Sequence, residues 1–94
     1  MEPVISVPYP NPSNGSPISF TVQTSGRSVV KMDIFTLNFR KIFDRTFEAE
    51  GVQTVSWNLK DPMGDQVANG VYYVRINITG SQSVTKIVKV LILR

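Results

Sequence analysis

The chain reads Tyr-Pro-Asn-Pro-Ser-Asn-Gly at residues 9–15 and Gly-Val-Tyr-Tyr-Val-Arg-Ile at residues 70–76. Proline lacks a backbone N–H and fixes φ, so the first stretch can be neither a helix interior nor a central strand. The second stretch is β-branched and aromatic, and leads into an apolar run that stops at Arg94. These two stretches predict an opening turn and, at the other end, two long strands that close a small sheet structure.

Composition narrows the class of protein. A chain of 94 residues makes one domain with a thin but sufficient core. Cysteine and histidine are absent, which excludes disulfides, thiol nucleophiles and the commonest general base and metal ligand. No apolar run approaches the roughly 20 residues that span a bilayer. The net charge is +3, and no acidic residue follows Asp65, so the basic residues gather towards the end of the chain.

Hydrophobic alternation divides the chain into seven predicted strands. In three of them every second residue is apolar, which indicates one buried and one open face. The continuous apolar run from Ile87 to Leu93 differs, and predicts a strand whose two faces both need cover. The predicted strands cover residues 4–7, 18–24, 28–36, 40–48, 53–58, 71–79 and 83–93.

Turn residues separate these strands. Gly26, in Ser-Gly-Arg at residues 25–27, and Gly51 are expected at corners, and Thr-Gly-Ser at residues 79–81 at the last hairpin tip. Asp-Pro-Met-Gly at residues 61–64 has the signature of a type I turn that ends on Gly64. Turn signals every 8–14 residues favour a β-sandwich.

One segment admits a second interpretation. A spacing of four relates Phe39 to Phe43 and Phe43 to Phe47, which also suits a helix that Asn38 could cap. The segment is short, rich in phenylalanine and lies between two strands that a hairpin would join. A strand is therefore preferred.

Four stretches occur in the order seen in one superfamily. They resemble the immunoglobulin-like domain of flagellar hook-capping proteins and its relative, the type A sorting domain of type IX secretion. The resemblance implies an all-β fold, a seven-stranded immunoglobulin-like (fibronectin III-like) antiparallel β-sandwich, over residues 1–94. The stretches are residues 9–15, 34–42, 57–76 and 86–94, with Tyr-Pro-Asn-Pro and Val-Ala-Asn-Gly-Val-Tyr-Tyr (67–73) the most specific parts.

The chain departs from this family at two glycines. Phe39 stands where the family usually has a glycine in a hairpin turn, and Asn58-Leu59 stands where it usually reads Asp-Gly. Loss of a turn glycine implies a changed turn, and Asn38 is the expected residue with positive φ.

The motif residues have physical roles that need no chemistry. The indole of Trp57 is expected to fill the core, Gly70 to form a tight corner before Val71, and the proline cluster to end the first strand and protect a sheet edge. The residues assigned structural roles are Tyr9, Pro10, Asn11, Pro12, Trp57, Gly64, Gly70 and Tyr72.

Candidate chemistry is weak beside these roles. Asp61 and Asp65 could bind Ca²⁺, but a solvated turn is the favoured interpretation because few other oxygen donors lie nearby. A carboxylate pair would need a cleft that a domain of this size has little room for; its candidates are Asp33, Asp44, Glu48 and Glu50. No catalytic residue, metal site or cofactor is therefore predicted.

Nucleic-acid binding would draw on the basic C-terminal half, with Tyr72 and Tyr73 as stacking platforms. The charge is modest and one tyrosine should be buried, so neither nucleic-acid binding nor membrane insertion is expected.

The resemblance implies a C-terminal module of a larger exported protein, recognised by the type IX machinery and carried through the periplasm to the surface or beyond. A structural assembly or spacer module is the alternative. The expected partner is a protein, with self-association through the last strand also open. Lys86, Lys89 and Arg94 are the residues expected to meet the partner.

Overall fold

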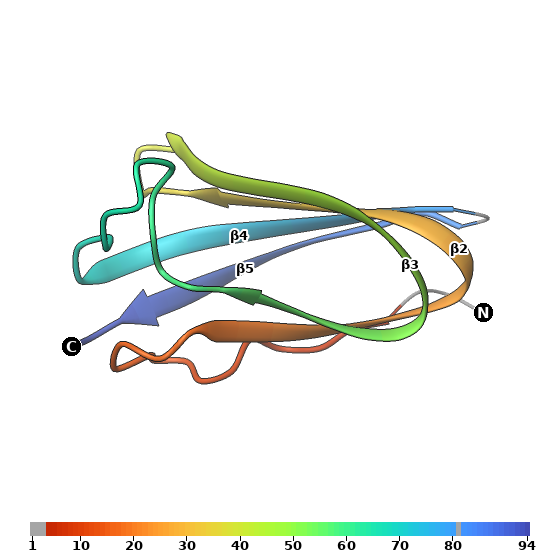
Figure 1. Ribbon diagram of the computed structural model, residues 1–94, viewed down its shortest axis with the longest axis horizontal. Helices are drawn as coiled ribbons and strands as arrows, with labels where there is room; N and C mark the ends of the chain where they lie inside the picture. The colour runs from red at the N-terminus through yellow and green to blue at the C-terminus, as the bar shows by residue number, and fades with distance from the viewer. Residues whose placement is uncertain (1–3, 81) are drawn as a thin grey trace.

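The computed structural model describes residues 4–80 and 82–94, and its regular structure is entirely strand (Figure 1). All pairings between strands are antiparallel and join them into one sheet. The described residues include no helix that could serve as a membrane span. The strands are β1 (Val4–Ile5), β2 (Ile18–Phe35), β3 (Lys41–Trp57), β4 (Gly70–Thr79) and β5 (Val84–Ile92).

The expectation of seven strands is wrong, because two pairs of predicted strands are continuous. β2 joins residues 18–24 to 28–35, and β3 joins residues 41–48 to 53–57. Gly26 does not adopt positive φ; a register shift between Thr24 and Ser28 takes up the extra residues instead. Gly51 has φ of 82° and pairs with Thr24, so β2 and β3 bend together at the same place.

The segment after Asn38 is the predicted strand, and the helical interpretation is wrong. Residues 41–49 pair with β2 along its second half, from Phe35 back to Ser28. The residue spacing of this segment suits a helix or a strand. Pairing with β2 decides for the strand, because it gives the backbone N–H and C=O groups their hydrogen-bond partners. The predicted hairpin tip at residues 79–81 includes Ser81, which lies outside the described residues.

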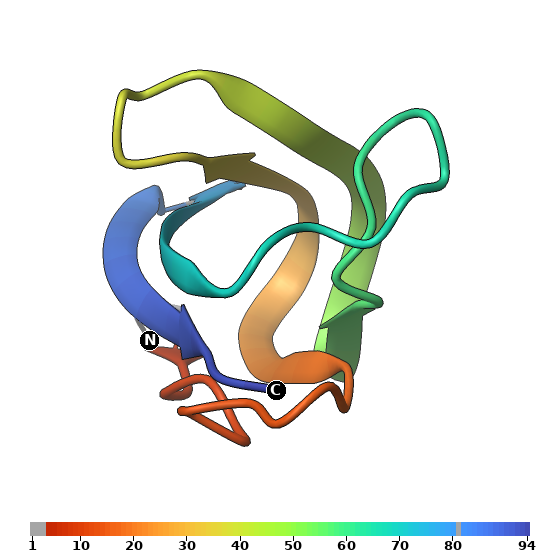
Figure 2. The ribbon, with the colours of Figure 1, turned by 90° about the vertical axis from the view of Figure 1, so that its left-hand side faces the viewer.

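Strand β2 is the centre of the sheet. β3 pairs with one side of it along nearly its whole length, while β1 and β4 share the other side, and β5 lies beside β4. The bend in β2 and β3 brings the two halves of the sheet face to face (Figure 2). The half of the sheet that contains residues 18–24 of β2 also contains β1. The half that contains residues 28–35 of β2 also contains β4 and β5.

The N-terminal segment bridges the two halves. The backbone of Tyr9 exchanges two hydrogen bonds with Ser19 on β2, at 3.0 and 2.8 Å. Four residues later Ser13 pairs with β5: its N–H donates to Leu91 O and its carbonyl accepts from the Leu93 N–H. The Asn11 amide imitates a strand between them, as its side chain donates to Lys89 O and accepts from the Leu91 N–H. β1 ends at Ile5, before the proline cluster and short of the predicted strand 4–7, and the cluster covers part of the β5 edge.

Alternation places the core where the sequence predicts it. Ile18, Phe20 and Val22 of β2 are fully buried, and so are Val74 and Ile78 of β4. Trp57 is also fully buried: its ring contacts Tyr72 edge-on at 5.7 Å and its Nε1–H donates to Lys60 O at 3.1 Å. Trp57 is the largest fully buried side chain among the described residues, and its N–H is satisfied.

The loop between β3 and β4 is organised by Asp61. Its Oδ1 accepts hydrogen bonds from the backbone N–H groups of Met63 and Asp65, and its carbonyl accepts from Gly64 N–H at 3.0 Å. This is the predicted turn, with Gly64 at φ of 86°, and Gly70 at φ of 147° opens β4. The Asp61 carboxylate is thus occupied in forming the turn.

Candidate interaction surface

The three predicted contact residues do not form one patch. Lys86 lies on the core side of β5, half-buried, and its Nζ donates to Ile5 O on β1 at 3.3 Å. Lys89 is exposed on the opposite side of the strand, since residues an odd number apart point to opposite faces. Arg94 turns back to the loop before β4, where its guanidinium donates to Val67 O at 2.8 Å. The structure therefore brings only Lys89 to the open face of β5.

Strand β5 has one covered and one open side. Val90 and Ile92 are fully buried, whereas Ile87 on the other side keeps 63% of its surface exposed. The expectation that both sides need cover is met on one side, which the domain covers itself. The other side leaves apolar surface exposed, and its cover stays a prediction. The open side belongs to the outer surface of β2, β4 and β5.

Cross-strand rows define that outer surface. Phe35 on β2 lies opposite Tyr73 on β4, which lies opposite Lys89 on β5. Opposite residues of an antiparallel pair share a face, so these side chains are neighbours. The next row is Asp33, Arg75 and Ile87.

The turn between β2 and β3 adds a ring to this surface. Phe39 stacks on Tyr73 with centroids 5.4 Å apart and planes within 9°. The residue with positive φ in this turn is Phe39 itself, at 60°, so the expectation for Asn38 is wrong. Stacking on Tyr73 contributes about 0.5–1.5 kcal/mol, which offsets a left-handed conformation costing about 1–2 kcal/mol.

A buried carboxylate lies beneath the surface. Only 1% of the Asp33 side chain is exposed, and its Oδ2 accepts from the Arg75 guanidinium at 2.9 Å. The Lys41 ammonium lies 3.7 Å from Oδ1, an atom without a hydrogen-bond partner. Arg75 also sits 5.3 Å from the centre of the Phe35 ring. The two cations balance the buried charge, and the ion pair fixes the position of Arg75.

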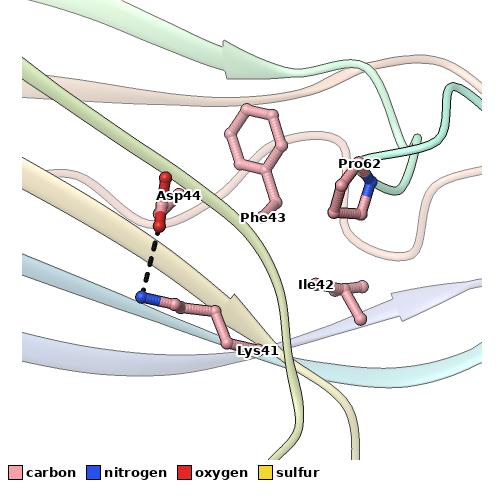
Figure 3. Close-up of a pocket in the computed structure, with 5 residues that line it drawn as sticks. All are labelled: Lys41, Ile42, Phe43, Asp44 and Pro62. Carbon is pink, nitrogen blue, oxygen red and sulfur yellow. Dashed lines mark ion pairs between the residues drawn. The ribbon is translucent and has the colours of Figure 1, made fainter.

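A shallow hollow of about 390 Å³ lies beside the start of β3. Ile42, Phe43 and Pro62 line it, together with Lys41 and Asp44, whose Nζ and Oδ2 are 3.2 Å apart (Figure 3). A second hollow of about 480 Å³ shares Ile42 and Pro62 and reaches the Tyr72 ring. Both have mainly apolar linings, and the Lys41–Asp44 ion pair belongs to the first.

The Tyr72 hydroxyl is bonded rather than free. It donates to Ala68 O at 2.6 Å. Burial raises the pKa of this phenol, against the opposing effect of the Arg94 guanidinium. Within residues 4–80 and 82–94, no three His, Cys, Asp or Glu side chains gather closely enough to hold a metal ion. The side chains described here therefore offer surfaces for contact. The Tyr72 hydroxyl and the Arg94 guanidinium are already hydrogen-bonded within the domain.

The sequence did not single out Phe35, Phe39, Tyr73 or Arg75 as a group. Alternation in residues 71–79 and 83–93 is a usable signal. It places Tyr73 and Arg75 on the face of the strand that points away from the buried side chains of Tyr72 and Val74. No local signal relates Phe39 to Tyr73, since they lie 34 positions apart and meet only through a turn.

Solved structures that share the fold include two Porphyromonas gingivalis proteins. The crystal structure of dimeric latent PorU from Porphyromonas gingivalis superposes with a TM-score of 0.79 at 16% identity, covering 99% of this chain and 10% of that one. PorZ, described as an essential bacterial surface component of the type-IX secretion system of the human oral-microbiomic Porphyromonas gingivalis, gives a TM-score of 0.62 at 23% identity, covering 94% and 11%. The chain thus spans about a tenth of either protein. No curated protein matches it.

A family match extends over most of the chain. The pattern of the secretion system C-terminal sorting domain covers residues 7–90, from the segment before the proline cluster into β5. Its members sort proteins for export to the cell surface or the extracellular space, and the family is not a catalytic one. The resemblance seen in the sequence is confirmed: the chain belongs to the family of secretion system C-terminal sorting domains.

Proposed function

We propose that this chain is the non-catalytic C-terminal module of a larger exported protein, recognised as a folded domain by the type IX secretion machinery. The observation that carries this proposal is the family match over residues 7–90. The PorU and PorZ structures support the fold part of it. The passenger joined to the module would pass through the periplasm and end at the surface or in the medium.

The two halves of the bent sheet would correspond to the two sheets of an immunoglobulin-like sandwich. Residues 4–9, 18–24 and 51–57 would form one sheet, and residues 28–35, 41–49, 70–79 and 84–92 the other. The side-changing N-terminal segment, which pairs antiparallel at Tyr9 and parallel at Ser13, supports this interpretation. The buried surface between the halves would then be the contact between two sheets.

The contact with the machinery would involve the C-terminal strand. Lys86, Lys89 and Arg94 are the candidates from the sequence. Lys86 and Arg94 already donate to backbone carbonyls of the domain, so their contribution would be to hold β5 in place. Lys89 is the candidate that faces outward.

The direct test fuses the domain to the C-terminus of a folded reporter that carries its own signal for crossing the inner membrane. The fusion is expressed in a host with type IX secretion and in an isogenic strain lacking the machinery. We expect the reporter at the surface or in the medium of the first host, and in the periplasm of the second. A reporter retained in the periplasm of both hosts contradicts the proposal and favours the assembly or spacer role.

A further inference from the structure

The turn at Phe39 holds an exposed aromatic ring in a strained conformation. A phenylalanine at φ of 60° costs about 1–2 kcal/mol, and a glycine would remove that cost. The side chain is 71% exposed, so its burial does not explain the choice. Its ring is nevertheless held flat against Tyr73. Strained residues that present a side chain to solvent are found at binding sites, where the strain positions the side chain before the partner arrives.

Basic residues lie on the same side of the sheet as this ring pair. Lys89 lies opposite Tyr73 on the neighbouring strand, and Asp33 holds the Arg75 guanidinium in place. Lys31 is exposed on β2, two residues before Asp33 and on the same face. No acidic residue occurs in β4 or β5. Ile87 adds exposed apolar surface in the Arg75 row. We call this surface the aromatic–basic face; it comprises Lys31, Phe35, Phe39, Tyr73, Arg75, Ile87 and Lys89.

The other outer surface of the domain has a different chemistry. Its rows are Ser19 with Ser56 and Thr21 with Thr54, and the two serine hydroxyls are 2.8 Å apart. The next row is Val4, Gln23 and Val52, whose two valines are exposed, and these rows carry no charge. We call this surface the hydroxyl face. Mutually bonded hydroxyl groups and two valines offer a partner less than a stacked aromatic pair flanked by cations, so the aromatic–basic face is the one suited to contact.

We propose that the aromatic–basic face docks on a protein whose contact surface is apolar with an acidic rim, in the secretion machinery; this rests on the proposed function. Complementary charge supports the acidic rim, because the one carboxylate on β2, β4 and β5, Asp33, is buried and paired. The exposed Asp44, opposite Asp33 on β3, is paired with Lys41. The exposed Phe39 and Ile87 require an apolar centre. A nucleic acid fits less well, because few cations line the face and aliphatic side chains lie between them.

The first experiment uses the reporter fusion with three variants. Phe39→Gly removes the ring and relieves the strain, so the domain stays folded. The pair Lys31→Gln and Lys89→Gln lowers the charge of the aromatic–basic face by two. The matched control, Gln23→Glu with Thr54→Glu, makes the same charge change on the hydroxyl face. Near-native unfolding midpoints must first establish that all three are folded.

We expect Phe39→Gly to slow export by about tenfold, as loss of an aromatic anchor weakens binding. The lysine pair is expected to slow export several-fold, and the control to match the parent. If the parent is exported and all three variants keep pace with it, the docking surface is wrong although the proposed function stands. If the parent stays in the periplasm, the proposed function fails and this inference fails with it.

The second experiment identifies the kind of partner. A photoreactive amino acid replaces Ile87 on the aromatic–basic face or Thr54 on the hydroxyl face. We expect a protease-sensitive adduct from position 87 alone, reduced by Phe39→Gly and by the lysine pair. Equal adducts from both positions contradict the docking surface. An adduct that resists protease but is digested by nuclease or glycosidase contradicts a protein partner, and one unaffected by the lysine pair contradicts the acidic rim.

Discussion

The turn at Phe39 and the turn at Leu59 both hold a non-glycine residue at positive φ, at 60° and 64°. Each stands where the family resemblance leads one to expect glycine. Leu59 is fully buried, whereas Phe39 keeps 71% of its surface exposed. Two adjacent tyrosines of β4 contact these two regions. The Tyr73 ring stacks on Phe39, and the Tyr72 hydroxyl donates a hydrogen bond to Ala68 O in the loop that follows Leu59.

The difference shows that the same strain can be compensated in two ways. Burial of a leucine side chain contributes about 1.5–3 kcal/mol, which exceeds the cost of one left-handed residue. At Leu59 the core therefore explains the residue. At Phe39 the gain from stacking only matches the cost, so the domain's own stability gives little reason to prefer phenylalanine to glycine.

The largest effect is expected from removing the anchor of the Leu59 turn. Trp57→Ala deletes a fully buried ring and the hydrogen bond from Nε1 to Lys60 O, so it should cost about 3–5 kcal/mol. Chemical denaturation of the purified domain measures the loss, with circular dichroism checking that the variant folds at all. A loss below about 1 kcal/mol would show that Trp57 does not anchor the core.

Two substitutions of Leu59 separate burial from strain. Leu59→Ala loses the buried side chain but keeps the left-handed strain, so it should cost about 2–5 kcal/mol. Leu59→Gly loses the same side chain and relieves the strain, so it should be about 1 kcal/mol less destabilising. Denaturant midpoints of the two variants decide the point. An alanine variant as stable as the glycine variant, or more so, would mean that strain is negligible here.

Tyr72→Phe tests the hydrogen bond behind this turn. Loss of the bond to Ala68 O should cost about 0.5–1.5 kcal/mol at neutral pH. Because the folded-state pKa of Tyr72 is raised above the ordinary tyrosine value of 10.0, its contribution is complete below pH 10 and declines as pH rises through the folded pKa. The stability difference between parent and variant should therefore shrink above pH 10. Denaturation at pH 8 and pH 11 measures both values, and a difference that grows at pH 11 would contradict the raised pKa.

The smallest effect is expected at the exposed turn. Phe39→Gly exchanges the stack on Tyr73 for relief of strain, so its stability should stay within about 1 kcal/mol of the parent. Phe39→Ala loses the stack and keeps the strain, and should be the less stable of the two. Thermal unfolding of both variants provides the comparison. A loss above about 2 kcal/mol in the glycine variant would give Phe39 a structural role and remove the reason to seek a binding one.

Period-two alternation in the sequence determined which residues form the core. Ile18, Phe20 and Val22 are buried because a strand directs every second side chain to the same face, wherever that strand pairs. The turn at Asp61 and Gly64 was equally readable, since its hydrogen bonds join residues within four positions of one another. The family could also be recognised from the sequence, because its motifs combine local turns of this kind with strands that alternate apolar and polar residues.

Only the tertiary structure decided how many strands there are and which residues meet. Gly26 and Gly51 are turn signals in the sequence, yet β2 and β3 pair on both sides of them, so the chain bends where it was expected to reverse. Lys86, Lys89 and Arg94 are close in sequence, but strand alternation and the bonds to Ile5 and Val67 direct them apart. Phe39 reaches Tyr73 through packing between distant segments, and contacts of that kind depend on the whole fold, which no local pattern encodes.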